Sequence, residues 1–260
     1  MNEPFSCHGR LHCEFIPFVR GNDDFSVLNG EKINPFIDGD ALPGDYGEVK
    51  CLGNSGKVYK NLMLGISPSP SYKARLHEHP KVGLNILMLG FDSTSRMTWM
   101  RNLPKSHEYF TKTLRGTVLK GYNIVGDGTP SALLPILTGK TEQELPEARR
   151  GYKNATVVDN HPWIWKDFHN AGYVTQWGED AASIGTFTYR MLGFKEQPVD
   201  HYLRPFYIHA ESQYNSHKPF CLGSLPRHVN MLNWVKDFFS VCADTPKFSF
   251  LFHSEFTHNG

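Results

Sequence analysis

The sequence has no apolar run that approaches the roughly 20 residues needed by a membrane-spanning helix. Its N-terminus has no charged region followed by an apolar stretch, so it does not have the pattern of a signal peptide. Neither sign of charge is in excess, because 27 Lys and Arg residues against 26 Asp and Glu residues leave a net charge of +1. We therefore expect no nucleic-acid partner and no membrane segment in this chain.

Two chemical motifs are also missing. None of the five cysteines, at positions 7, 13, 51, 221 and 242, has the C-x-x-C spacing of zinc ribbons and thioredoxins. No G-x-S-x-G sequence occurs, which disfavours an α/β-hydrolase. The cysteine spacing leaves two alternatives open, disulfides in a secreted protein or reduced thiols in a cytosolic one. The glycosylation sequon Asn154-Ala-Thr156 is compatible with secretion, although such triplets also arise by chance.

The pattern that is present from residue 81 onward is an alternation of strand-like and helix-like segments. With 260 residues, 40% of them hydrophobic, the chain can form one large α/β domain or two small ones. The expected strands are 83–90, 117–125, 173–177 and 247–252. The expected helices are 95–102, 105–114, a helix starting at Thr129, 163–170, 183–192 and 227–242. This alternation predicts a mostly parallel sheet covered by helices.

Residues 1–80 have a different character. Glycine and proline are frequent there, and only short segments such as 15–20 and 58–64 resemble strands. The segment Ser67-Pro-Ser-Pro-Ser71 has the composition of a linker. We predict an accessory β-rich segment that leads into the core, and an irregular extension lying on the core is the alternative.

Asp92 directly follows the apolar run Asn85–Gly90, which is typical of a strand buried on both faces. In open α/β sheets, ligands bind beyond the carboxyl ends of the strands, so Asp92 is the first candidate for a site. The alternative is that Asp92 caps the helix that starts near Ser95.

Thr129 is the second candidate, because Thr129-Pro130 has the pattern of an N-cap followed by proline at the first helical position. A hydroxyl at a helix N-terminus lies where anions are favoured, and with a metal to stabilise its alkoxide it could attack phosphorus or sulfur. The alternative is an ordinary cap. Since both residues follow strand-like runs, we expect Asp92 and Thr129 to meet at the carboxyl edge of one sheet.

Together these segments resemble the DUF229 family of the alkaline phosphatase and sulfatase superfamily, over nearly the whole chain. The resembling residues are Leu-Gly-Phe-Asp-Ser-Thr-Ser-Arg at 89–96, Gly-Tyr-Asn-Ile-Val-Gly-Asp-Gly-Thr at 121–129, Leu-Thr-Gly at 137–139, Gly178-Glu-Asp180, His201-Tyr-Leu-Arg-Pro-Phe206 and Glu255-Phe-Thr-His258. The resemblance implies an alkaline phosphatase-like α/β/α sandwich with helices on both faces of the sheet. Residues 81–260 would then be the N-terminal part of the catalytic domain.

The resemblance also implies roles for individual residues. Asp92 would be a metal ligand, Thr129 the metal-activated nucleophile, and His258 with Glu255 would bind a second metal. Two divalent ions are implied, which could be zinc, calcium or magnesium. From the residues alone, His258 and Glu255 would be assigned to a solvated loop that follows the last expected strand. Arg96 and Asp180 are candidates for substrate binding, with a core salt bridge and a helix-start carboxylate as their respective alternatives.

An Asp-His-Gly segment, which family members place later and which supplies further metal ligands, does not occur in this sequence. The expectation is therefore an N-terminal fragment with an incomplete sheet. The implied function is metal-dependent hydrolysis or transfer of phosphate or sulfate esters through Thr129, inactive in this chain by itself. The alternative is a non-catalytic secreted binding protein that keeps the fold.

The same resemblance implies the surroundings in which the protein works. The substrate would be an anionic ester carried on a glycan or a lipid. The location would be extracellular or the lumen of the secretory pathway, with Asn154 as a glycosylation site. Disulfides would join Cys13 to Cys51 and Cys221 to Cys242, which leaves Cys7 unpaired.

Overall fold

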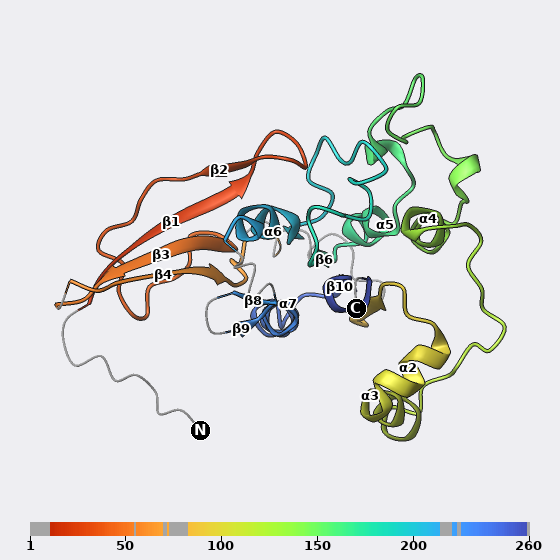
Figure 1. The fold of residues 1–260 in the computed structure, drawn as a ribbon, viewed down its shortest axis with the longest axis horizontal. Helices are drawn as coiled ribbons and strands as arrows, with labels where there is room; N and C mark the ends of the chain where they lie inside the picture. Colours follow the sequence, from red (N-terminus) through yellow and green to blue (C-terminus); the bar gives the residue numbers. More distant parts are fainter. Residues whose placement is uncertain are drawn as a thin grey trace.

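Two four-stranded sheets, one antiparallel and one parallel, form the framework of a mixed α/β fold (Figure 1). The structure is a computed structural model that describes residues 11–54, 56–69, 72, 83–213, 220–222 and 225–258. The antiparallel sheet comes from the N-terminal quarter of the chain and the parallel sheet from the remainder.

The antiparallel sheet has the strand order β2-β1-β3-β4. Its strands are β1 (His12–Arg20), β2 (Val27–Asn29), β3 (Tyr46–Leu52) and β4 (Val58–Leu64). Phe15 and Phe18 of β1 are both buried, but they are three positions apart and therefore point to opposite faces of the sheet. Phe15 packs with Val49 and Cys51 in one cluster, and Phe18 packs with Tyr46 in another. The strands predicted at 15–20 and 58–64 are confirmed. The predicted linker at 67–71 lies partly outside the described residues.

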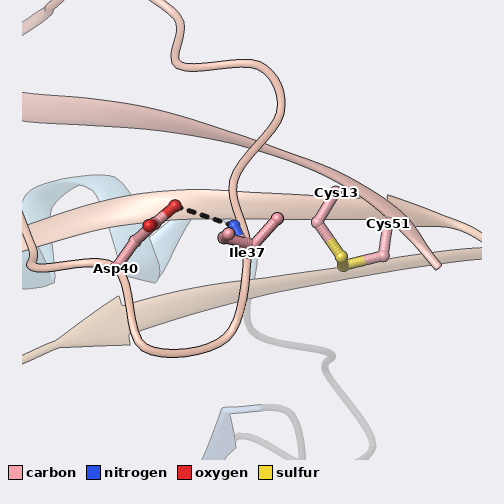
Figure 2. The surroundings of a disulfide bond; sticks show 4 residues. All are labelled: Cys13, Ile37, Asp40 and Cys51. Carbon is pink, nitrogen blue, oxygen red and sulfur yellow. Dashed lines mark hydrogen bonds between the residues drawn. A yellow bond between two sulfur atoms is a disulfide. The ribbon is translucent and has the colours of Figure 1, made fainter.

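A disulfide joins the two central strands of this sheet (Figure 2). Cys13 of β1 and Cys51 of β3 are directly opposite in the strand register, and their Cα atoms are 4.0 Å apart. In the loop beside it, the Asp40 carboxylate accepts a hydrogen bond of 2.8 Å from the backbone N–H of Ile37. The predicted pairing of Cys13 with Cys51 is confirmed.

The second predicted disulfide, between Cys221 and Cys242, is wrong, because both cysteines are free. Cys221 lies in the small hairpin that precedes helix α7 (Arg227–Val241), and Cys242 caps the other end of that helix. A helix of 15 residues is about 22 Å long, far beyond the roughly 7 Å that a disulfide can span between Cα atoms. Cys7 lies outside the described residues.

The parallel sheet has the order β5-β10-β6-β7, with every neighbouring pair parallel. Its strands are β5 (Ile86–Phe91), β6 (Val174–Glu179), β7 (His201–Tyr202) and β10 (Lys247–His253). Every residue of β10 is buried, as expected for an inner strand covered on both faces. The strands predicted at 83–90, 173–177 and 247–252 are confirmed.

Helices cover both faces of the parallel sheet. On one face, Phe248, Phe250 and Phe252 pack in a core with helices α4 (Thr129–Thr138) and α5 (Ile164–Asn170). On the other face, Leu251 packs in a second core with α6 (Arg204–Glu211) and α7. The alternating side chains of β10 therefore pack in two cores, one on each face of the sheet. The predicted helices at 163–170 and 227–242 are confirmed.

The other elements are short. They are α2 (Arg96–Asn102), α3 (Pro104–Glu108), the π-helical turn η1 (Tyr109–Thr113), the 3-10 turns η2 (Glu142–Glu144) and η3 (Val158–Asn160), the hairpin strands β8 (Cys221–Leu222) and β9 (Leu225–Pro226), and α8 (Glu255–His258). The expected helices at 95–102 and 105–114 are present, and Pro104 begins the second of them, as its position predicts.

Two sequence predictions are corrected by the structure. The predicted strand at 117–125 is an irregular connection that contains a turn and no strand pairing, and β5 pairs only with β10 among the described residues. A strand needs a neighbour for its backbone groups, so the β-forming residues of this stretch do not suffice. The predicted helix at 183–192 is a series of turns. Its backbone is held by other partners, because Thr186 N–H donates to the Glu179 carboxylate and Leu192 N–H donates to the carbonyl of Ala148.

The antiparallel sheet packs directly against helices of the parallel sheet. Phe18, Tyr46 and Leu62 belong to the same buried cluster as Phe206 of α6 and Trp234 of α7. The proposed division into an accessory segment, 1–80, and a core, 81–260, stays a prediction. The shared core shows that the β-rich segment is tightly attached.

Candidate functional site

Asp92 lies at the carboxyl end of β5, where its backbone N–H donates to the carbonyl of His253 on the neighbouring strand (2.8 Å). Its side chain is almost fully buried. The N-cap of α2 is Ser95, whose hydroxyl accepts from the N–H of Thr98 at 3.1 Å. The alternative role of Asp92 as the helix cap is therefore excluded, and its carboxylate serves another partner.

That partner is Thr129. The Thr129 hydroxyl donates a hydrogen bond to the Asp92 carboxylate, with 3.3 Å between Oγ1 and Oδ1. The two side chains, 37 residues apart in sequence, therefore meet as predicted. One detail of the prediction is wrong, because the N-cap of α4 is Gly128 and Thr129 is the first helical residue. Its side chain makes no capping bond and is directed to Asp92 instead.

Gly128 gives this arrangement its backbone geometry. Its φ of 88° and ψ of 164° belong to a region that only glycine occupies readily. A side chain at this position would also meet the guanidinium of Arg190. The glycine before Thr129 thus lets the chain turn into α4 at the angle that brings the hydroxyl to the sheet edge.

The pair offers one carboxylate and one hydroxyl oxygen, a chemistry that suits a hard divalent cation. Catalytic metal sites usually have about three protein ligands. Within the part of the chain that the structure describes, no group of three or more His, Cys, Asp or Glu side chains is arranged to hold a metal. The pair fits part of a metal site, and further ligands would have to come from outside the described residues.

The segment after β10 lies on the same edge of the sheet, since β10 and β5 run parallel with Phe250 opposite Met88. That placement of α8, which carries Glu255 and His258, is confirmed. Glu255 forms an ion pair of 3.1 Å with Arg227 at the start of α7. Burial raises the pKa of Glu255, and Arg227 opposes the shift. His258 is exposed, and metal binding by either residue stays a prediction.

Asp180, at the end of β6, has its carboxylate fully engaged within the protein. Oδ1 accepts the N–H of Ser254 at 2.7 Å, and Oδ2 lies 2.6 Å from Nδ1 of His253. Burial alone would raise the pKa of Asp180, but the bonds from His253 and Ser254 outweigh it and hold the pKa below its usual range. Asp180 thus fixes the turn between β10 and α8, while its predicted substrate contact stays a prediction.

Arg96, the first residue of α2, is exposed and makes no ion pair among the described residues. It lines a cavity of about 710 Å³ together with part of α4 and part of the connection that precedes α4. Its substrate-binding role stays a prediction, and the alternative of a core salt bridge is not what the structure shows.

Sequence reasoning missed a buried charge cluster at the same sheet edge. Glu179 is enclosed beside Arg204, with 3.6 Å between Oε1 and Nη1, and Arg204 also donates to the backbone carbonyl of Asp24 at 2.7 Å. Burial raises the pKa of Glu179, with Arg204 opposing. A carboxylate at the end of a strand-like run was a visible signal in the sequence, but its arginine partner, 25 residues further along the chain, was not.

The sequence contains one adjacent Asp-His pair, Asp200-His201, which the sequence interpretation overlooked. His201 begins β7 and bonds to Asp45 through Nδ1 (2.6 Å) and to the Tyr72 hydroxyl through Nε2 (2.9 Å). Its ring packs edge-on against Phe238 of α7, on the face of the sheet opposite α4. The pair therefore supplies no ligand to Asp92 and Thr129.

The fold and the site together define an α/β protein with a hydroxyl–carboxylate pair at the carboxyl edge of a parallel sheet. Residues 11–260 match the family model described as "Protein of unknown function (DUF229)", and the chain belongs to this family. Comparison with curated proteins found no match, and comparison with solved structures found none either. Among the described residues, no helix combines the length and apolarity required to cross a membrane.

Proposed function

We propose that this protein is a metal-dependent hydrolase or transferase of phosphate or sulfate esters, built on an alkaline phosphatase-like sandwich. The observation that carries the proposal is the 3.3 Å contact between the Thr129 hydroxyl and the Asp92 carboxylate at the carboxyl edge of the parallel sheet. A hydroxyl in that position is aimed by its acceptor, and the N-terminus of α4 favours an anionic group beside it.

The chemistry assigned to the chain's own residues is nucleophilic. Oγ1 of Thr129 attacks phosphorus or sulfur, the bond to the ester oxygen breaks, and the departing alcohol takes up a proton equivalent to the one that Oγ1 loses. Water, or an acceptor alcohol, then attacks the Thr129 ester and restores the hydroxyl. Asp92 orients the hydroxyl before attack and accepts its hydrogen bond.

A divalent ion held by Asp92 and Thr129 would supply charge stabilisation for the alkoxide and for the leaving oxygen. Glu255 and His258 are the proposed ligands of a second ion on the same edge. Zinc, calcium and magnesium each suit oxygen donors, and a histidine ligand favours zinc.

A second candidate is a binding protein that keeps the fold without turnover. One observation favours it, namely that the Glu255 carboxylate is already paired with Arg227 at 3.1 Å. For either candidate we propose an extracellular or secretory-pathway location. The Cys13–Cys51 disulfide supports it, and so does the exposed turn that carries the Asn154 sequon.

Turnover of an aryl phosphate and an aryl sulfate, measured with each divalent metal for the natural full-length protein, tests the proposal. Thr129→Ala and Asp92→Asn are expected to abolish turnover, while Thr129→Ser, which keeps a hydroxyl, retains part of it. The matched control is Thr138→Ala at the other end of α4. Metal-independent turnover, or turnover that survives Thr129→Ala, would favour another mechanism, and complete inactivity with every metal would favour the binding protein.

A further inference from the structure

Helix α4 continues from Thr129 as a helix with no charged residue, Thr-Pro-Ser-Ala-Leu-Leu-Pro-Ile-Leu-Thr. A surface helix normally turns a polar face to solvent, so an apolar face that lies outside the core marks a candidate contact surface. The core takes one side of α4, through Leu133, Leu134 and Leu137. The opposite side, with Ala132, Pro135 and Ile136, is not part of that core and lines the cavity of about 710 Å³.

The remaining wall of this cavity comes from Arg96 and from the connection before α4. The lining residues are Arg96, Val118, Leu119, Tyr122, Asn123, Val125, Ala132, Pro135 and Ile136. Most of these side chains are apolar, and Arg96 is the one charged residue. Ligand pockets of 300 to 1,000 Å³ with mostly apolar walls and few polar groups are typical sites for small molecules.

The cavity begins about one helical turn from the candidate catalytic pair, because its lining starts at Ala132 of α4 and does not include Asp92 or Thr129. Residues 129, 132 and 136 are spaced by three and four positions, so they form one stripe along α4. This stripe runs about 10 Å from Thr129 to Ile136, at roughly 1.5 Å per residue. At the other wall, Arg96 is only four residues beyond Asp92 and makes no ion pair among the described residues. An apolar stripe of α4 and the Arg96 guanidinium therefore line one cavity near the helix end that carries the Thr129 hydroxyl.

We propose that the cavity receives the apolar part of the ester whose anionic group reacts at Thr129. The substrate class is then an amphipathic phosphate or sulfate ester with an aliphatic or aromatic group, in contrast to a purely hydrophilic sugar ester. Arg96 pairs with the anionic group at the mouth of the cavity, and Ile136 contacts the apolar group at its far end. This inference rests on the proposed function and names its substrate class.

Binding of octyl phosphate, measured by titration calorimetry below its micelle concentration, tests the inference without turnover. Inorganic phosphate and octyl glucoside are the reference probes, since each carries only one half of the amphiphile. We expect octyl phosphate to bind at least tenfold more tightly than either. Ile136→Asn is expected to weaken octyl phosphate binding about tenfold and to leave inorganic phosphate unchanged. The matched control is Leu232→Asn, the same kind of change at an exposed position of α7.

Arg96→Gln should weaken octyl phosphate about tenfold and leave octyl glucoside unchanged, because it removes only the charge contact. Equal affinities for octyl phosphate and inorganic phosphate would overturn the inference, as would equal effects of the Ile136 and Leu232 variants. Octyl phosphate that fails to bind, together with a dimer that Ile136→Asn dissociates, would assign the cavity to a second copy instead. Octyl phosphate binding that Ile136→Asn weakens, in a protein that turns over no ester with any divalent metal, would sink the proposed function and leave the cavity as a ligand site.

Discussion

At the scale of single residues, the site depends on a backbone conformation that only glycine provides easily. Gly128 precedes Thr129 with φ 88°, and Gly139, with φ 70°, ends the same helix in open space. Both positions disfavour a side chain through their backbone angles, but only Gly128 also has Arg190 beside it. Comparing substitutions at Gly128 and Gly139 therefore separates the general loss of stability caused by a positive φ from the loss specific to the site.

Gly139→Ala is expected to lower the free energy of unfolding by about 1 kcal/mol, the usual cost of a left-handed residue with a Cβ. Gly128→Ala is expected to cost about 2–3 kcal/mol, because its φ and ψ lie in the region reserved for glycine, whereas the Arg190 guanidinium beside it is the end of a flexible side chain and can move away. Urea unfolding of both variants measures the difference. Equal costs would show that Gly128 has no special role in turning the chain into α4.

A second residue-scale feature is the buried contact between His201 and Asp45, which ties β7 to the start of β3. Burial alone would lower the pKa of His201, but its bonds with Asp45 and Cys242 outweigh this and raise the pKa to about 9. A pKa raised in the folded state stabilises the fold fully below the unfolded value of 6.5, and the stabilisation is lost as the pH rises through about 9.

His201→Gln, which cannot take up the proton, should therefore lose the most stability near pH 6. The difference in unfolding free energy between wild type and variant should shrink by on the order of 3 kcal/mol between pH 6 and pH 10. Urea unfolding at several pH values measures it. A difference that does not change with pH would mean that His201 is neutral in the folded protein.

At the scale of elements, the sequence predicted those whose pattern is sufficient by itself. The run that became β5 is apolar throughout, β6 and β10 carry β-branched or aromatic side chains along short segments, and α7 has a clear amphipathic period. The segments at 117–125 and 183–192 failed because their structure depends on partners. One has no strand to pair with among the described residues, and the other has its N–H groups bound by distant acceptors such as Glu179.

In the candidate site, the contact between Asp92 and Thr129 was predicted from the sequence, whereas the other side-chain contacts were not. The prediction that Asp92 and Thr129 meet is confirmed, but its premise holds only for Asp92, which follows β5. Among the described residues, no strand directly precedes Thr129, and it is the start of α4 after Gly128 that brings its hydroxyl to Asp92. The pairing of Asp180 with His253, and of Glu255 with Arg227, joins residues far apart in sequence and leaves no local signal. Cysteine spacing does not determine disulfide connectivity, and of the two pairings that the family resemblance implied, Cys13–Cys51 is confirmed and Cys221–Cys242 is wrong.

The Cys13–Cys51 disulfide joins two strands, whereas helix α7 separates the two free cysteines, Cys221 and Cys242. Peptide mapping without reduction should find Cys13 linked to Cys51, and should find Cys221 and Cys242 both alkylated. Native protein should react at the exposed Cys221, and Cys242 should react only after unfolding. Reduction of the Cys13–Cys51 bond should lower the unfolding free energy by about 3–4 kcal/mol, the loop-entropy value for this spacing. A linked Cys221–Cys242 peptide would contradict the placement of α7 between them.

At the scale of the whole molecule, the two sheets share one core. Phe18 and Tyr46 pack with Phe206, the Tyr46 hydroxyl donates to the backbone carbonyl of Tyr202 (3.3 Å), and the Trp234 indole donates to that of Gly65 (3.0 Å). These contacts attach the β-rich segment to the parallel sheet and its helices, and they help to stabilise the sheet that carries the site.

The chain should consequently unfold in one cooperative transition. Far-UV circular dichroism, which reports both sheets, and tryptophan fluorescence, which reports Trp163, Trp165, Trp177 and Trp234 in the two cores, should give the same midpoint in urea. Trp234→Ala should shift both curves together, by about 3–5 kcal/mol. Two separate transitions would instead support an independent N-terminal domain ending near residue 80.

The most direct test of the central claim is capture of the covalent intermediate on Thr129. The full-length protein is incubated with an aryl phosphate and a divalent metal, quenched in acid and mapped by peptide mass spectrometry. We expect phosphate on the peptide that contains Thr129, dependent on the metal and absent from the Asp92→Asn variant. Phosphate on another residue would contradict the assignment of Thr129 as nucleophile. So would consumption of the aryl phosphate without any labelled peptide.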